Sequence, residues 1–236
     1  MRRRVSLIGT LGLGLAFSSA AVSAETVEEV SKKIAAASEK LNSFSAKTKM
    51  VIEMKQEGFS MVSTTDGTTE MLRKGSDFLV RTENKSVAET NVGGNVTKQE
   101  SSVLMIVDGS FVYSVSESAG AKSAQKMKLE KPDVDPFKVW RTTSDLKVLP
   151  DSSSDGRAAW VIEAIPKPDQ AAGQGKTVIH YDKESGQMIK MITYTPDGKP
   201  MSTMTYSDIK INDKISPDRF VFKAPPGVEV QDLSGK

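Results

Sequence analysis

The feature that most constrains the fold is an alternation of side-chain character every two residues, interrupted at short intervals by turn signals. The segment MVIEMK at residues 50–55 has the two-residue period typical of a β-strand. Short strands joined by tight turns pair with their neighbours in the chain, which predicts an antiparallel meander. The turn signals, which favour positive φ angles, are Asp66-Gly67, Asp108-Gly109, Asp155-Gly156, Asp197-Gly198, Gly93-Gly94 and the KESG segment at 183–186.

About eleven strands are expected between these turns. A sheet of that size curls or closes on itself. Loops are expected at 116–125, which is rich in glycine, serine and alanine, and at 167–175. The strands are expected near 44–57, 60–74, 77–90, 97–107, 110–116, 145–149, 157–165, 175–182, 187–195, 200–210 and 219–223.

Two helices interrupt the strand pattern. Residues 26–41 carry an apolar stripe at spacings of three and four, and Thr26 with Glu29 forms a capping box. Within 131–145, Asp135 is a suitable N-cap and Pro136 suits the first helical position. Phe137 and Trp140 would then share one face of a short helix. With so few helices, both are expected to cover one face of a concave sheet in a single domain, residues 25–236.

The N-terminus has the three parts of a secretory signal peptide. Arg2, Arg3 and Arg4 precede an apolar run at 5–17, and small residues at 22–24 offer a cleavage site after Ala24. The run is shorter than the roughly 20 residues of a bilayer span. An uncleaved anchor is the alternative. We expect residues 1–24 to be removed and the mature protein to be periplasmic.

Composition then excludes several classes of function. Residues 1–24 hold three arginines and no acid, so the remainder carries a net charge of −1, which gives no electrostatic case for nucleic acid. There is no cysteine, hence no disulfide and no lipobox. The one histidine, His180, is expected to face solvent or to pair locally with Asp182.

No set of residues points to catalysis. Carboxylates are abundant, at Asp133, Asp135, Glu163 and Asp182 for example, but nothing in the sequence sets a pair at working distance. A single histidine makes a His-rich zinc site or a hydrolase triad improbable, and no glycine-rich phosphate loop precedes a helix. We expect no enzyme activity, no cofactor and no metal.

Methionine is unusually frequent in the predicted strands. Its flexible, polarizable side chain suits a pliable apolar cavity, and the alternative is an ordinary core packed with methionine in place of leucine. Segments 102–107 and 188–194 are apolar on both faces, so both faces are covered or one of them meets a ligand. Residues in Phe111–Val115 and Trp160–Ile162 are further candidates for inward positions.

The order of several segments resembles the periplasmic outer-membrane lipoprotein carrier family (LolA-like). The most specific match is SPDRFVFKAPPGVEVQD at 216–232, in which an F-x-F strand, a proline bend and Gly-Val with an acidic residue close the chain. There Phe220 and Phe222 would face the core, and Pro225-Pro226 would end pairing at the sheet edge. The other segments are LNSFSAKTKMVIEM (41–54), FLVRTE (78–83) and IVDGSFVYSV (106–115).

The resemblance implies a mainly β (α+β) fold: an open, strongly curved antiparallel β-barrel of about 11 strands whose concave apolar face is covered by the N-terminal and central helices. It implies a carrier that binds acyl chains of lipoproteins or lipids and ferries them toward the outer membrane. The alternative is an envelope lipid or lipoprotein sensor that uses the same cavity. Implied partners are acylated lipoproteins or lipids, an inner-membrane releasing complex and an outer-membrane acceptor, with the carrier itself a monomer.

Candidate cavity residues follow from the inward apolar positions and the resemblance. The family also places an arginine where it hydrogen-bonds the helical lid, and here Arg73 or Lys74 occupies the corresponding region, with Gly75 where the family has proline. The candidates for the acyl-chain cavity are Met50, Ile52, Met54, Phe78, Val80, Met105, Phe111, Tyr113, Phe137, Trp140, Trp160, Ile162, Met191 and Met204.

Overall fold

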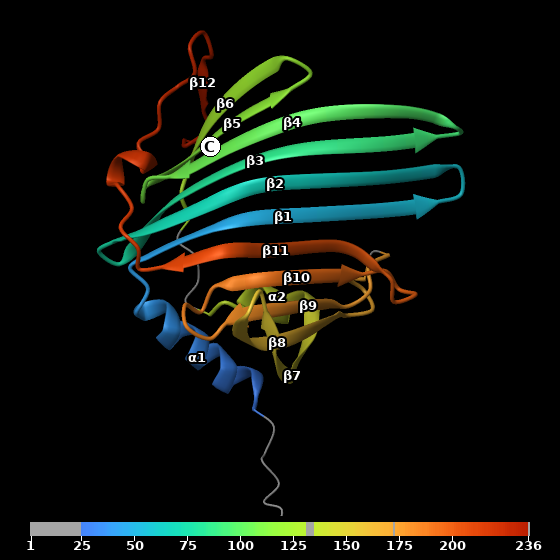
Figure 1. The fold of residues 1–236 in the computed structure, drawn as a ribbon, viewed down its shortest axis with the longest axis vertical. Coiled ribbons are helices and arrows are strands. Elements are labelled where there is room, and N and C mark those ends of the chain that lie inside the picture. Colours follow the sequence, from blue (N-terminus) through green and yellow to red (C-terminus); the bar gives the residue numbers. More distant parts are fainter. Residues whose placement is uncertain (1–24, 131–134, 172, 236) are drawn as a thin grey trace, which may run out of the picture.

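A single twisted sheet dominates the structure, a computed structural model that describes residues 25–130, 135–171 and 173–235 (Figure 1). The predicted signal peptide at 1–24 lies outside the described residues. The helices are α1 (Val27–Glu39), α2 (Lys138–Thr143) and the 3₁₀ helix η1 (Pro217–Phe220). The strands are β1 (Ser43–Gln56), β2 (Phe59–Lys74), β3 (Asp77–Val92), β4 (Asn95–Val107), β5 (Phe111–Ser118), β6 (Ala121–Lys128), β7 (Ser144–Ser154), β8 (Arg157–Pro166), β9 (Thr177–Asp182), β10 (Met188–Tyr194), β11 (Pro200–Ile211) and β12 (Val230–Asp232).

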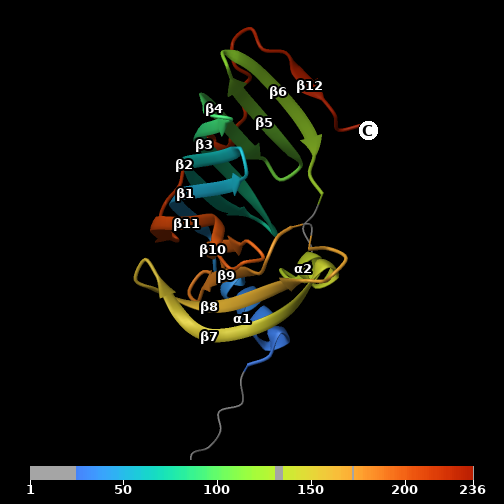
Figure 2. The same cartoon turned by 90° about the vertical axis from the view of Figure 1, so that its right-hand side faces the viewer.

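The sheet is open and curved, as predicted. Its strand order is β12-β6-β5-β4-β3-β2-β1-β11-β10-β9-β8-β7, and all neighbours are antiparallel except the short β12, which runs parallel to β6. Seen edge-on, the sheet bends so that its two ends come round toward the side where α2 lies (Figure 2). We call this side the concave face and the other the convex face. The predicted mainly β fold with two covering helices is confirmed.

One loop prediction and one strand prediction are wrong. Residues 116–125, expected to be a loop, mostly belong to the β5–β6 hairpin, whose turn is confined to Ala119 and Gly120 at positive φ. Residues 219–223, expected to be a strand, form the end of η1 and an extended stretch instead. The last strand is β12, which follows the bend at Gly227 and covers part of the edge of β6.

Asp66-Gly67 does not form a turn. Both residues lie inside β2, which pairs without interruption with β1 and β3. A Cβ on Gly67 would overlap the backbone carbonyl of Glu83 and the side chain of Asn84. Glycine is therefore present because two neighbouring groups come close, and not because the backbone reverses. The other three Asp-Gly pairs do lie between strands.

Helices α1 and α2 cover one half of the concave face. The capping box of α1 is present, with the Glu29 amide donating to Thr26 Oγ1 and the Thr26 amide donating to Glu29. Val30, Ile34 and Ala37 form the buried stripe of α1. They pack with Phe137 against Trp160, Ile162, Ile179 and Tyr181 of β8 and β9. This half of the sheet contains the main core.

The central helix is shorter than predicted. It begins at Lys138, with Phe137 as the N-cap, and not at Asp135 and Pro136. Asp135 still supports the preceding turn, because its carboxylate accepts the Phe137 amide at 2.9 Å. None of the helices in the described part of the chain is both long and apolar enough to cross a membrane.

Candidate ligand-binding face

The strand register defines what each face of the sheet carries. Because side chains alternate between faces and paired residues share a face, one row can be followed across ten strands. The row starts under the helices at β7 and ends at β5. Its members are Val148, Ile162, Ile179, Met191, Met204, Met50, Thr65, Ser86, Ser101 and Ser118. The concave face therefore changes from apolar to hydroxyl-bearing between β1 and β2.

The apolar half extends beyond the helices. Met50 and Met204 pair across β1 and β11, and Met54 pairs with Met61 across β1 and β2. These side chains are half-buried, except Met54, which is 37% exposed. We define the methionine band as Met50, Ile52, Met54, Met61, Met191 and Met204. Partly open apolar surface beside a closed core is where an apolar ligand could gain contacts.

Twelve of the predicted cavity residues lie on the concave side or in the segment of Phe137 and α2 that packs there. Phe137, Trp140, Trp160, Ile162 and Met191 belong to the main core or pack on it, with Phe137 and Ile162 fully buried. Met50, Ile52, Met54 and Met204 lie in the methionine band. Phe78, Val80 and Met105 lie on the same face, on β3 and β4.

Phe111 and Tyr113 do not lie with the others. Val107 pairs with Val112 across β4 and β5, which puts Val112 on the concave face and both aromatic residues on the convex face. There the Tyr113 ring stacks on Phe222 of the C-terminal segment at 4.5 Å between ring centroids. The local alternation identified one shared face correctly, but it was the opposite face from the cavity.

Arg73 connects β2 to the end of α1. Its Nη2 donates to the Ser38 carbonyl and its Nε to the Leu41 carbonyl, each at 2.7 Å. Its guanidinium also lies 4.4 Å from the centroid of the Phe78 ring. A helix C-terminus has unpaired carbonyls that favour a cation. These two hydrogen bonds hold the end of α1 against the sheet. That α1 moves as a lid stays a prediction.

Sequence reasoning missed the hydroxyl-bearing part of the concave face. Thr65 and Ser86 are 2.7 Å apart between hydroxyl oxygens, and Ser116 and Ser123 are 2.8 Å apart. We call Thr65, Ser86, Ser101, Ser114, Ser116 and Ser118 the hydroxyl field. The alternating serines and threonines within β2–β5 were the available signal. They gave no indication of which face they would share.

Charge is distributed very unequally between the two faces. In β1–β6, every charged side chain except Arg73 occupies a convex-face position. Lys49, Lys85 and Glu100 are examples, all exposed. Strand faces that meet water normally carry such residues. The half-open concave face thus has a composition that suits contact with an uncharged ligand.

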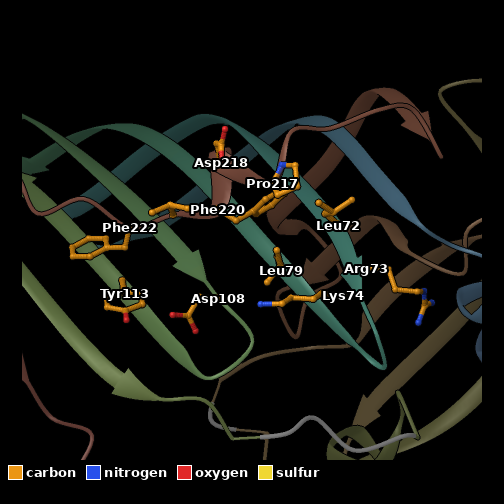
Figure 3. Close-up of a pocket in the computed structure, with 11 residues that line it drawn as sticks. Leu72, Arg73, Lys74, Leu79, Asp108, Tyr113, Pro217, Asp218, Phe220 and Phe222 are labelled. Atoms are coloured by element: carbon orange, nitrogen blue, oxygen red, sulfur yellow. The ribbon is translucent and has the colours of Figure 1, made fainter.

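A pocket lies on the convex face. The C-terminal segment from Pro217 to Phe222 crosses β2–β5 there and leaves a pocket of about 550 Å³ (Figure 3). Leu72, Leu79 and Tyr113 form its floor, and Lys74, Asp108 and Asp218 supply charges. Burial raises the pKa of Tyr113, and the nearby Asp108 carboxylate raises it further. In the figure, Arg73 points away from the other labelled side chains.

Among the described residues, the titratable side chains form no candidate metal centre. No cluster of three or more metal-ligating side chains occurs there. His180 is half-buried, and its Nδ1 lies 2.9 Å from Ser152 Oγ. Burial and then Lys190 lower the pKa of His180. The expected pairing with Asp182 is wrong, because that carboxylate accepts hydrogen bonds from Arg157 and Ser185.

Comparisons with known proteins find similar structures at low sequence identity. A family model described as an uncharacterized protein matches residues 112–224. Curated proteins give no match. Among solved structures, an uncharacterized conserved protein from Thermus thermophilus is 8% identical with a TM-score of 0.46, and the alignment covers 87% of this chain and 98% of that one.

Two other similar structures belong to named proteins. MucB, in the MucA/MucB complex from Pseudomonas aeruginosa, is 16% identical with a TM-score of 0.41; the alignment covers 81% of this chain and 59% of that one. This chain spans less than two thirds of the MucB chains it matches. An outer membrane lipoprotein-sorting protein domain from Vibrio parahaemolyticus is 14% identical with a TM-score of 0.35. The alignment covers 81% of this chain and 94% of that one.

Proposed function

We propose that this protein binds acyl chains on its concave face and carries lipoproteins or lipids through the periplasm toward the outer membrane. The observation that supports this most directly is the methionine band. It lies half-open beside the helix-covered core, on a face whose one charged side chain in β1–β6, Arg73, is hydrogen-bonded to carbonyls at the end of α1. The sequence resemblance to the lipoprotein carriers supports the same function. Delivery from an inner-membrane releasing complex to an outer-membrane acceptor belongs to the proposal.

The band has the physical properties that acyl-chain binding requires. Removing a methylene from water contributes about 0.8 kcal/mol, so even partial burial of one chain is worth several kcal/mol. Methionine side chains adjust to chains of different length and branching because they have three rotatable bonds and a polarizable sulfur. Binding and release need no covalent chemistry.

The test is ligand identification followed by a pair of matched variants. Native mass spectrometry of gently purified mature protein should show an acyl-bearing ligand, and the emptied protein should take up a fluorescent fatty acid. Met50→Asp places a charge in the methionine band and should weaken probe binding by about tenfold or more, equivalent to about 1.4 kcal/mol. The control is Val51→Asp, at the next, half-buried position on the convex face.

The outcomes separate clearly. Loss of binding in Met50→Asp with retention in Val51→Asp supports the concave face as the site, provided that circular dichroism shows both variants folded. Equal binding by both variants would contradict the location. A purified protein that carries no acylated ligand and takes up no fatty acid or acylated peptide would contradict the function itself.

A further inference from the structure

We propose that the ligand has an uncharged, hydroxyl-rich head group, as in a glycosyl diacylglycerol, which lies over the hydroxyl field. This inference rests on the proposed function, because it assigns the polar end of a ligand whose acyl chains occupy the methionine band. Three observations support it: the missing charges, the paired hydroxyls, and the direct contact between the two regions.

The absence of charge acts against an ionic head group. An anionic phosphate moved from water onto a partly closed surface loses solvation and needs a counter-charge or several donors in return. On the concave positions of β1–β6, Arg73 is the exception, and its guanidinium already donates to the Ser38 and Leu41 carbonyls. The many lysines of these strands lie on the other face. A neutral head group has no such requirement.

The hydroxyl field offers the matching hydrogen-bonding capacity. Each serine or threonine hydroxyl has one donor and two acceptor sites. The pairs Thr65–Ser86 and Ser116–Ser123 use only part of this capacity. Thr65, Ser86 and Ser116 are half-buried, so their remaining sites face the open side of the sheet. A sugar, whose hydroxyls also both donate and accept, is complementary to such a surface.

The two regions adjoin at one pair of residues. Met50 in the band is the direct β1–β2 partner of Thr65 in the field. The field then continues through β3, β4 and β5 along the same row. At about 4.8 Å between strands, the three spacings from β2 to β5 span about 14 Å, which exceeds what a single phosphate requires. Chains and head group of one amphiphile can therefore lie side by side.

The first experiment compares ligands that differ only in the head group. The mature protein is mixed with vesicles that contain either monogalactosyl diacylglycerol or phosphatidylglycerol of identical acyl composition, and extracted lipid is quantified. A diacylated lipopeptide and soluble methyl galactoside complete the set. We expect the galactolipid to be extracted at least about tenfold better than phosphatidylglycerol, with no binding of the soluble galactoside.

The second experiment locates the head group. Thr65→Val combined with Ser86→Ala removes one hydroxyl pair and should lower galactolipid binding about tenfold, while fatty-acid binding stays unchanged. The control is Thr64→Val, which alters a half-buried threonine on the convex side of the same strand. An equal effect of the control would overturn the assignment to the concave face.

Each remaining result has one meaning. Equal extraction of all diacyl lipids, or preference for phosphatidylglycerol or the lipopeptide, overturns the head-group inference and leaves acyl-chain binding intact. Binding of methyl galactoside alone overturns the joint arrangement of chains and sugar. Failure to extract any acylated ligand contradicts the proposed function, and this inference with it.

Discussion

The Arg73 side chain donates a hydrogen bond of 2.7 Å to the Ser38 carbonyl at the end of α1. A second bond of the same length goes from its Nε to the Leu41 carbonyl. One guanidinium thus joins the middle of the sheet to the helix that covers half of the concave face. Its planar fork matches two carbonyls, and its charge complements the negative end of the helix dipole.

Replacing Arg73 should loosen the end of α1. Arg73→Met keeps most of the side-chain bulk but removes both bonds, and hydrogen bonds from charged donors contribute about 1.5–3 kcal/mol each. We expect a clear loss of stability in urea unfolding and faster hydrogen exchange in α1. If α1 is a lid, fatty-acid uptake should also become faster.

Arg73→Lys and Arg81→Met are the matched comparisons. Lysine keeps the charge without the fork, so it should recover only part of the stability. Arg81 lies on the convex face and donates to the Arg219 carbonyl at 3.1 Å. Its replacement should leave the exchange of α1 unchanged. Unchanged α1 exchange in Arg73→Met would refute the proposed tie.

Local patterns in the sequence were sufficient for the elements whose stability is local. The stripe and capping box of α1 are contained within sixteen residues, and Asp155-Gly156 forms the expected turn with positive φ at both positions. Gly67 shows the limit of this approach. A long strand pairing overrode the turn preference of Asp66-Gly67, and the reason for the glycine lies on β3.

The candidate site was predictable only in part, because face assignment depends on register. Within β5 the alternation groups Phe111 with Tyr113, but the turn at Asp108 and Gly109 decides which face they occupy. The convex position leaves them under the C-terminal segment. The hydroxyl field arises from four strands in register, and no single strand reveals it.

Arg157 and Asp182 form a buried ion pair in the helix-covered half. The Asp182 carboxylate is 2% exposed and accepts Arg157 Nε at 2.8 Å and Nη2 at 3.0 Å. Removing one partner leaves a buried charge, so Arg157→Met should cost about 3–5 kcal/mol in the free energy of unfolding. Glu184 is the exposed partner of Arg157, so Glu184→Gln should lower the free energy of unfolding by less than about 1 kcal/mol.

The same pair predicts a dependence of stability on pH. Burial by itself raises the pKa of Asp182, but the bonds from Arg157 and Ser185 outweigh it and hold the pKa below its ordinary value. The stabilisation is therefore fully present above about pH 4, the ordinary range, and is lost as the pH falls through the folded pKa. Urea unfolding from pH 6 to pH 2.5 should show this loss. Asp182→Asn should be less stable than the unchanged protein at pH 6. Its free energy of unfolding should also fall less steeply as the pH is lowered.

Gly67→Ala should destabilise the sheet although it adds one methyl group. The new Cβ would overlap the Glu83 carbonyl oxygen and Asn84 Oδ1 and lie 2.9 Å from Thr48 Oγ1. Overpacking of this kind costs about 1–3 kcal/mol. The double variant Gly67→Ala with Asn84→Ala removes the side-chain overlap but not the backbone overlap, so thermal unfolding should show only partial recovery. Full recovery would mean that Asn84 alone requires the glycine.

The C-terminal segment should be held mainly by one of its two phenylalanines. Phe220 is 2% exposed on the convex face, whereas Phe222 is half-buried and stacks on Tyr113. Phe220→Ala should therefore cost about 3–5 kcal/mol, as for other buried aromatic residues. Phe222→Ala loses chiefly the ring pair and its partial burial, so we expect about 1–2 kcal/mol. Urea unfolding measures both costs, and limited trypsin proteolysis after the exposed Lys223, which both variants retain, reports release of the segment. Equal costs would show that the segment is held along its length, and unchanged fatty-acid uptake in both variants would separate this convex anchor from the concave face.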